Sequence, residues 1–133
     1  MAEKLHLEII TPLELVLSEE VDEVVAPGEV GEFGILPGHI PFLSLLSPGE
    51  LKYTSGGTET RLIVWGGLAD IREDRVKVLV DGVERPEDIE PEEAKAELDK
   101  VSEEMKSFEG DSAGLKELQR RLRLAELRAS AGA

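Results

Sequence analysis

The first two thirds of the chain alternate between hydrophobic and polar residues with the period of β-strands. The run 5–9 places leucine or isoleucine at every second position, and Val76, Val78 and Val80 repeat this pattern further along. A period of two is expected where one face of a strand is buried and the other meets solvent. The pattern predicts strands at 5–9, 13–18, 42–46, 50–54, 61–65, 68–72 and 75–80.

Turn residues separate these runs. Pro27-Gly28 predicts one turn, 55–57 (Ser-Gly-Gly) a hairpin turn, and Glu73-Asp74 another, because glycine, proline and aspartate suit the backbone of tight turns. The alternation fails near Asp22-Glu23, which predicts a bulge or a change of register there. Short strands at close spacing with such punctuation are typical of a β-sandwich or flattened barrel.

The hydrophobic period changes near Pro86, from two to that of a helix. Pro91 suits the first turn of a helix, where its missing N–H is not needed, and Asp111 or Ser112 is placed to cap a second helix. Two helices joined by so short a link are expected to pack antiparallel. The apolar stripes that define them are Ala94, Leu98, Val101, Met105 and Phe108 in the first, and Leu115, Leu118, Leu122, Ala125 and Ala129 in the second.

These patterns predict two domains. Residues 1–87 form a mainly β domain, a sandwich or flattened barrel, and residues 88–133 form a C-terminal antiparallel two-helix hairpin. Aromatic residues make up only 4% of the 133 residues, so an aliphatic core is expected. The sequence has no cysteine and two histidines, His6 and His39. Disulfides and thiolate sites are therefore excluded, and neither a metal nor another cofactor is expected.

The charge narrows the classes of partner. A net charge of −14 argues against nucleic-acid binding, which needs a basic face for phosphates. No apolar run reaches the roughly 18 residues of a membrane span, and the N-terminal residues lack the apolar core of a signal peptide. We therefore expect a soluble protein that meets a membrane only indirectly, through a partner.

The charge is unevenly distributed between the two predicted helices. Residues 88–111 carry ten acidic residues against three lysines, whereas residues 112–133 carry five basic residues against two acidic ones. Leu124 and Leu127 lie opposite the apolar stripe of the second helix, beside or near its four arginines. Two interpretations stay open. The first is structural: the face is solvated, or its leucines dock on the β domain. The second is functional: the face binds an acidic partner.

The most specific stretch is residues 27–41, Pro-Gly-Glu-Val-Gly-Glu-Phe-Gly-Ile-Leu-Pro-Gly-His-Ile-Pro. Its glycines and prolines indicate a strand interrupted by tight turns. A phosphate loop is excluded, because the Gly-Lys step and the following helix are missing. His39 has no serine, cysteine or second histidine nearby in sequence, which favours a structural or interface role over a catalytic one.

This stretch resembles the signature of the epsilon subunit of bacterial and chloroplast F-type ATP synthases. The opening Leu7-Glu8-Ile9-Ile10-Thr11-Pro12, the Gly49-Glu50-Leu51 step, the Gly66-Gly67 pair and the Val76-Lys77-Val78-Leu79 strand occur in the family's order. The resemblance covers nearly the whole chain and is strongest up to about residue 85. Chain length and the order of β domain and hairpin agree with it.

The resemblance implies a non-catalytic rotor subunit in the central stalk, peripheral on the cytoplasmic side of the bacterial inner membrane. Its β domain binds the gamma subunit and the ring of c subunits, and thereby couples ring rotation to the catalytic head. Its hairpin extends toward the alpha and beta subunits and inhibits ATP hydrolysis. The residues expected at the c-ring are Glu29, Val30, Gly31, Glu32, Phe33, His39, Ile40, Pro41 and Phe42.

The same resemblance implies an inhibitory role for the basic second helix. It also locates an ATP-binding motif of the family that is altered in this chain. The inhibitory contact with an acidic segment of beta is expected from Arg120, Arg121, Arg123, Leu124, Leu127 and Arg128. Some family members bind ATP through an Ile-Asp-x-x-Arg-Ala motif, but this chain has Glu90 for the aspartate and Glu93 for the arginine. A carboxylate in place of a phosphate-facing cation repels nucleotide, so no ATP site is expected.

Two other classes of function compete with this interpretation. A generic β-sandwich binding module with a dimerising hairpin predicts a stable homodimer, but it leaves the Gly/Pro stretch unexplained. An enzyme is disfavoured because no nucleophile–base constellation is visible. Acidic residues are so plentiful that two of them could be paired almost anywhere, so such a pair is no evidence for a catalytic site.

Overall fold

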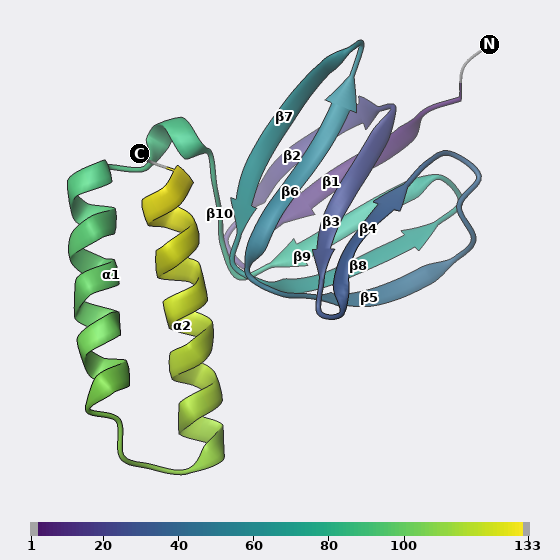
Figure 1. Cartoon of the computed structure of the whole chain (residues 1–133). Helices are drawn as coiled ribbons and strands as arrows, with labels where there is room; N and C mark the ends of the chain where they lie inside the picture. Colours follow the sequence, from purple (N-terminus) through teal and green to yellow (C-terminus); the bar gives the residue numbers. More distant parts are fainter. Residues whose placement is uncertain (1–2, 132–133) are drawn as a thin grey trace. The chain divides into compact units, whose positions relative to one another are not determined.

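The computed structural model describes residues 3–131, and the chain divides between Val83 and Glu84 into two compact units. The first unit is built from strands and the second contains two helices (Figure 1). The strands are β1 (Leu5–Ile10), β2 (Leu15–Val21), β3 (Glu23–Gly28), β4 (Gly31–Ile35), β5 (Phe42–Leu46), β6 (Gly49–Ser55), β7 (Thr58–Val64), β8 (Gly67–Arg72), β9 (Arg75–Val80) and β10 (Val83–Glu84). The helices are the short 3-10 helix η1 (Pro86–Asp88), α1 (Pro91–Lys106) and α2 (Ser112–Ala131).

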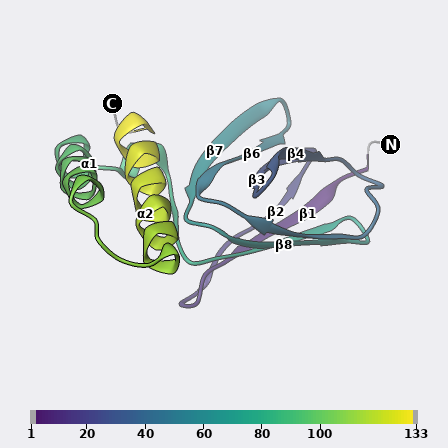
Figure 2. The ribbon, with the colours of Figure 1, turned by 60° about the horizontal axis from the view of Figure 1, so that its bottom comes forward.

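The described strands form one curled sheet in the order β10-β7-β6-β3-β5-β8-β9-β1-β2, with β4 paired to β3. The pairing of β1 with β9 is parallel, whereas β1–β2, β8–β9 and β5–β8 are antiparallel. The sheet folds over so that β6 and β7 lie across from β8 and β1 (Figure 2). This arrangement confirms the predicted sandwich or flattened barrel followed by a helical hairpin.

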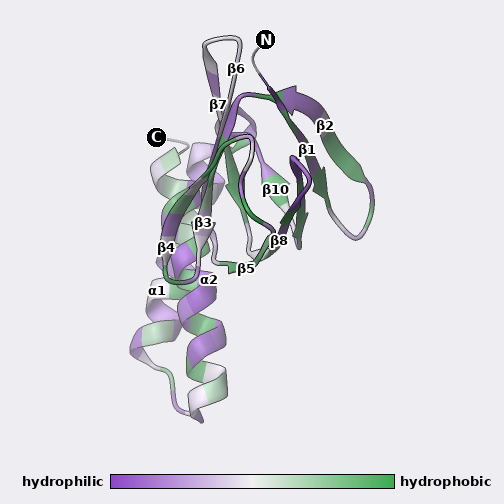
Figure 3. Cartoon of the chain, turned by 90° about the vertical axis from the view of Figure 1, so that its right-hand side faces the viewer, coloured by the Kyte–Doolittle hydropathy of each residue, from purple (hydrophilic) through white to green (hydrophobic). Residues whose placement is uncertain are grey.

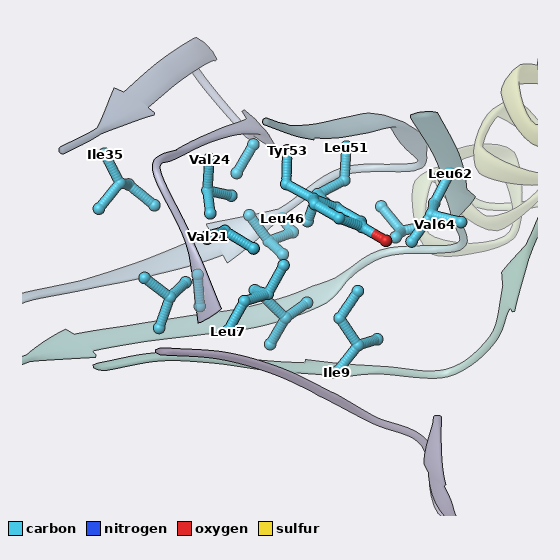
Figure 4. Close-up of a cluster of buried hydrophobic side chains, with 14 of the residues drawn as sticks. Leu7, Ile9, Val21, Val24, Ile35, Leu46, Leu51, Tyr53, Leu62 and Val64 are labelled. Atoms are coloured by element: carbon cyan, nitrogen blue, oxygen red, sulfur yellow. The ribbon is translucent and has the colours of Figure 1, made fainter. Parts of the chain in front are cut away.

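Alternate residues of the strands fill the space inside the curled sheet. Leu5, Leu7 and Ile9 of β1 are fully buried, and Val76 and Val78 of β9 face the same core. Ten of the core side chains are labelled in Figure 4, where they converge from both halves of the sheet. Tyr53 is the aromatic residue among the buried positions of the described chain, so the core is otherwise aliphatic, as the composition predicts.

One predicted turn and one predicted bulge or change of register can be compared with the observed strand boundaries. The predicted turn at Pro27-Gly28 is wrong: both residues are buried in β3, and the chain turns at Glu29-Val30. Pro27 is tolerated inside the strand because its carbonyl accepts from the Ser47 N–H (2.9 Å) while its missing N–H is not required there. The break expected near Asp22-Glu23 is where β2 ends and β3 begins.

Asp22 ties this corner of the sheet together. Its carboxylate accepts a hydrogen bond from Lys4 and another, at 2.9 Å, from the backbone N–H of Gly56 in the β6–β7 turn. Its own N–H donates to the carbonyl of Thr54 (2.7 Å). The hydrogen bond from Lys4, followed by that from Gly56, holds the pKa of Asp22 below its usual value.

The helical unit has its own small core. Pro91 occupies the first turn of α1, as predicted, and Asp111 caps α2 by accepting from the Gly114 N–H (2.8 Å). Val101, Leu118 and Ala125 are buried between the antiparallel helices, with other members of the predicted stripes packed against them. Phe108 belongs to this core although α1 ends at Lys106. The alternating hydrophobic and hydrophilic bands of both helices are visible in Figure 3.

Candidate partner-binding surfaces

The first predicted contact segment, residues 29–33, is the tip of the β3–β4 hairpin. Gly28 pairs with Gly31 across the turn, which places Val30 at the tip with its side chain fully exposed. The backbone N–H of Glu29 donates to the carbonyl of Leu45 (3.2 Å), so the base of the tip is fixed to β5. Phe33 is partly buried and packs against the sandwich core. The tip is thus an apolar residue between two glutamates, on a fixed base.

The second predicted segment, residues 39–42, lies in the β4–β5 loop and the first residue of β5. Ile40 is 73% exposed and Phe42 is 44% exposed. The Nδ1 of His39 lies 2.7 Å from the carbonyl oxygen of Ile40. A carbonyl can only accept, so Nδ1 carries the proton when the ring is neutral, and Nε2 is left as an acceptor. His39 therefore helps to shape the loop, as a structural or interface histidine would.

The structure places these two segments at opposite ends of β5. Gly28, beside the first tip, pairs with Leu46 at the end of β5, whereas His39 and Pro41 precede its start. An aromatic contact links them: the rings of Phe33 and Phe42 meet edge to face with centroids 5.5 Å apart. Glu32, expected to face a partner, lies 4.0 Å from Lys52 and is more than half exposed, which is a weak pair.

One exposed apolar surface was not predicted from the sequence. Five side chains on the outer face of the sheet stand next to one another on adjacent strands, and we call them the apolar row. Each neighbouring pair is in direct register across β5, β8, β9, β1 and β2. The row is Leu45, Leu68, Leu79, Ile10 and Leu15, with Leu45 59%, Leu79 38% and Leu15 53% exposed.

Further exposed apolar residues lie on the two outer strands of the row or next to them in sequence. Leu43 on β5 is 62% exposed, and on the β1–β2 side Leu13 is 94% and Val16 43% exposed. Contiguous exposed apolar patches are uncommon on monomeric soluble proteins and mark interaction sites. The sequence did carry a signal, because β5 is apolar on both faces and Leu79 is apolar on the solvent side of β9. Only the strand register shows that these positions are neighbours.

Further along the same face, the row gives way to charged residues. Glu8, Asp70, Arg72, Arg75 and Lys77 line a shallow depression, and Arg72 pairs with Asp70 through two hydrogen bonds of 3.2 Å. In the next register, His6 Nδ1 lies 2.7 Å from Glu20 and its Nε2 lies 3.0 Å from the hydroxyl of Ser18. The outer face is therefore divided into an apolar part and a part with mixed charge.

The arginines of α2 do not form one uniform face. Arg121 donates to Glu104 of α1 at 2.9 Å, and Arg128 holds Glu84 through two hydrogen bonds of 2.7 and 3.1 Å. Arg120 and Arg123 are exposed. Leu124 and Leu127 are partly buried, so neither is a fully solvated leucine. Arg121 and Arg128, both predicted to contact a partner, thus pair with carboxylates of the helical unit itself.

The start of α1 carries the two residues that replace the nucleotide motif. Glu90 is the N-cap residue of α1 but makes no side-chain cap hydrogen bond, and Glu93 lies in the first turn. Both are exposed. Carboxylates suit the positive end of a helix dipole, which accounts for their place without any ligand.

Residues 3–131 show neither a metal-ligand cluster nor a membrane-spanning helix. In this part of the chain, no three His, Cys, Asp or Glu side chains gather as metal ligands would. Neither α1 nor α2 is long and apolar enough to span a membrane.

Comparison with known proteins shows which family the chain belongs to. Residues 4–86 match the family model described as ATP synthase, Delta/Epsilon chain, beta-sandwich domain. The ATP synthase epsilon chain of Geotalea uraniireducens is 42% identical over 128 residues, covering 96% of this chain and 93% of that protein. The epsilon chain of Geobacter metallireducens is 43% identical over 132 residues, covering 94% and 96%. That of Nitratidesulfovibrio vulgaris is 55% identical over 95 residues, covering 71% of each.

Solved structures agree with the fold. A chain in the Euglena gracilis mitochondrial ATP synthase, in a structure of OSCP, F1 and the c-ring, matches with a TM-score of 0.83 and 24% identity, covering 96% of this chain and 81% of that one. A chain in the central stalk and c-ring of the Tetrahymena thermophila mitochondrial ATP synthase matches with a TM-score of 0.67 and 17% identity, covering 98% of both.

Proposed function

The chain belongs to the delta/epsilon family of ATP synthase chains, and from this premise we propose that it is a rotor subunit in the central stalk of a proton-translocating F-type enzyme. As an epsilon chain it is an accessory subunit and not itself catalytic. In the proposed role it couples rotation of the c-ring to the catalytic head through gamma, and its hairpin inhibits ATP hydrolysis. It would be held peripherally, through the ring, on the cytoplasmic side of a bacterial inner membrane.

The apolar row is the observation that carries this proposal. A stable protein–protein interface buries about 1,200–2,000 Å² and has an apolar centre with a polar rim. The outer face of the sheet has such an apolar centre with a charged edge, because the exposed Leu45, Leu79 and Leu15 lie near the charged residues of the same face. We assign this face to gamma.

The two loop segments are assigned to the c-ring. Val30 at one end of β5 and Ile40 at the other are exposed apolar side chains. Each has polar or charged neighbours in the chain, Glu29 and Glu32 around Val30 and His39 beside Ile40. This composition suits a contact that stays next to the polar surface of a membrane-embedded ring. Their separation along the strand means that they reach different parts of the ring surface.

The hairpin is assigned to inhibition through alpha and beta. Arg120 and Arg123 are exposed on α2, where an acidic partner can approach them, with Leu124 and Leu127 supplying apolar area. Exposed ion pairs are worth only about 0–1 kcal/mol each, so the contact needs several arginines together with the leucines. Arg121 and Arg128 join it only by leaving Glu104 and Glu84.

The test compares the full chain with a truncation that ends at Glu87. Both are assayed for binding to the gamma subunit of a closely related ATP synthase and for inhibition of ATP hydrolysis by its catalytic head. We expect both proteins to bind gamma and only the full chain to inhibit. Binding by both without inhibition by either would remove the inhibitory role and leave coupling. A stable homodimer that does not bind gamma would instead support the generic binding module.

Loss of ATP binding is a separate prediction. With Glu90 and Glu93 exposed at the start of α1, isothermal titration of ATP into the full chain should show no saturable binding below about 1 mM, since like charges repel. The double variant Glu90→Asp, Glu93→Arg restores the motif and should bind more tightly than wild type. Micromolar affinity in the unmodified chain would contradict the prediction.

A further inference from the structure

The turn between β8 and β9 adopts a backbone that its residues do not favour. Glu73 and Asp74 connect the strands in a tight hairpin flanked by the Arg72–Arg75 pair, and their φ angles are +49° and +59°. Positive φ at both central positions is usual for glycine, asparagine and aspartate, and it costs energy for other residues such as glutamate. A Glu-Asp sequence in this conformation is therefore held there by contacts elsewhere in the fold.

Asp74 makes two such contacts. Its carboxylate Oδ1 accepts from the backbone N–H of Gly38 at 2.7 Å, across 36 residues of sequence. Its main-chain carbonyl accepts from the N–H of His6 at 2.9 Å. An aspartate in this conformation commonly bonds to its own neighbouring backbone, but here the side chain reaches a different loop. Asp74 thus connects the β8–β9 turn to both β1 and the β4–β5 loop.

The β4–β5 loop has a shape that presents this N–H outward. The N–H of His39 donates to the carbonyl of Leu36 at 3.1 Å, which closes a turn with Pro37 and Gly38 at its centre. Gly38 has a φ of +86°, and proline followed by glycine is the sequence of a type II turn. In this turn the Gly38 N–H is not used by the turn's own hydrogen bond, so it is free to be held by Asp74.

The same loop carries exposed apolar side chains. Leu36 is 56%, Ile40 73% and Phe42 44% exposed. Apart from the aromatic contacts of Phe42 with Phe33 and His39, this group has solvent on its outer side. Exposed apolar residues on a loop lose binding energy to conformational entropy unless the loop is already ordered. A charge-assisted hydrogen bond to the centre of its turn is a means of ordering it.

We propose that Asp74 is a positioning residue that holds the β4–β5 loop in its binding conformation and so sets the affinity of the loop for its partner. The partner assignment rests on the proposed function, in which this loop meets the c-ring. Asp74 itself does not need to touch the ring. Its carboxylate acts through Gly38 on the presentation of Ile40 and Phe42.

Two variants separate this role from a merely structural one. Asp74→Gly removes the carboxylate but favours the positive φ of the turn, so thermal stability should change little, because the relaxed backbone offsets the lost hydrogen bond. Asp74→Asn keeps an acceptor oxygen and also tolerates positive φ. Each full-length protein is titrated against gamma alone and against a gamma–c-ring complex. The ratio of the two affinities reports the ring contact, and amide exchange at Gly38 reports the hydrogen bond.

For Asp74→Gly we expect at least 10-fold faster exchange at Gly38 and at least a 5-fold smaller ring-dependent gain in affinity, with unchanged binding to gamma alone. Asp74→Asn should stay within about 3-fold of wild type in both. Unchanged exchange at Gly38, or faster exchange with an unchanged ring-dependent gain, would overturn the positioning role. A wild-type protein that gains no affinity from the ring would instead refute the proposed ring contact on which the role rests.

Discussion

Replacing Leu79 by glutamate (Leu79→Glu) is expected to weaken binding to gamma by about 100-fold or more while leaving the chain folded. Leu79 stands in the middle of the apolar row, in register with Leu68 on one side and Ile10 on the other. Leu79 is already largely covered in the free chain, so completing its burial contributes only part of the roughly 1.5–3 kcal/mol of a full leucine burial. Desolvating an unpaired carboxylate costs several kcal/mol more. Their sum exceeds the roughly 2.8 kcal/mol that a 100-fold change in Kd requires.

The fold should tolerate this change, because Leu79 lies on the outer face and is 38% exposed. Thermal unfolding should show a loss of no more than about 1 kcal/mol, within the range of surface strand substitutions. Arg75→Glu is the matched control: the same strand, the same face and the same new residue, but among the charged positions. It should change the Kd for gamma by less than about 5-fold. Equal losses for the two variants would mean that the row is not the centre of the interface.

The strands could be read from the sequence because their pattern is local. β9 has the predicted bounds, Arg75–Val80, since three buried valines alternate with three exposed residues there. The turn at Pro27-Gly28 was placed wrongly for an equally physical reason. A Pro-Gly pair can form a turn, or it can end a buried strand that lies close to its neighbour. Only the pairing of Pro27 with Glu32 across β3 and β4 shows that the second case applies here.

The apolar row could not be read from the sequence in the same way. Ile10, Leu68 and Leu79 are far apart in the chain, and they become neighbours through a parallel β1–β9 pairing and an antiparallel β8–β9 pairing. A shift of one residue in either register would move these side chains to the core face. Which face an apolar residue occupies depends on non-local pairing, and local hydrophobicity does not fix it.

The loop and hairpin predictions show the same limit. The family resemblance identified His39 and Ile40, but not the aspartate 36 residues beyond Gly38 that holds their loop. The arginines of α2 were identified as a basic surface from the charge distribution, and the resemblance gave that surface a role. Charge counting cannot tell that Arg121 and Arg128 are paired, because their partners lie on α1 and in the segment before it.

The Arg128–Glu84 pair competes with the proposed inhibitory contact of Arg128, and this competition predicts a large effect on inhibition. Arg128 and Glu84 form a two-bond ion pair in which the side chains are only 26% and 20% exposed. Hydrogen bonds between charged groups contribute about 1.5–3 kcal/mol. If the inhibitory state uses Arg128 on an acidic partner, this energy opposes inhibition, and removing it shifts the population toward the inhibitory state.

Glu84→Gln is therefore expected to lower the concentration of protein needed for half-maximal inhibition of ATP hydrolysis by about 5- to 10-fold. Arg128→Glu should raise that concentration by at least a similar factor, because it loses the partner contact. The charge exchange Glu84→Arg, Arg128→Glu is the decisive variant: it offers the internal pair again, with the charges reversed, and still lacks the arginine for the partner.

Inhibition by the charge-exchanged chain should therefore be weak, like that of Arg128→Glu alone. Glu126→Gln, at an exposed acid of the same helix, is the control and should leave inhibition within about 2-fold of wild type. Recovery of inhibition by the charge exchange would show that Arg128 acts only by holding the hairpin to Glu84. A Glu84→Gln chain that inhibits no better than wild type would show that the pair does not oppose the inhibitory state. Because the two results contradict different steps, the experiment separates what Arg128 does within the helical unit, on Glu84, from what it does on a partner.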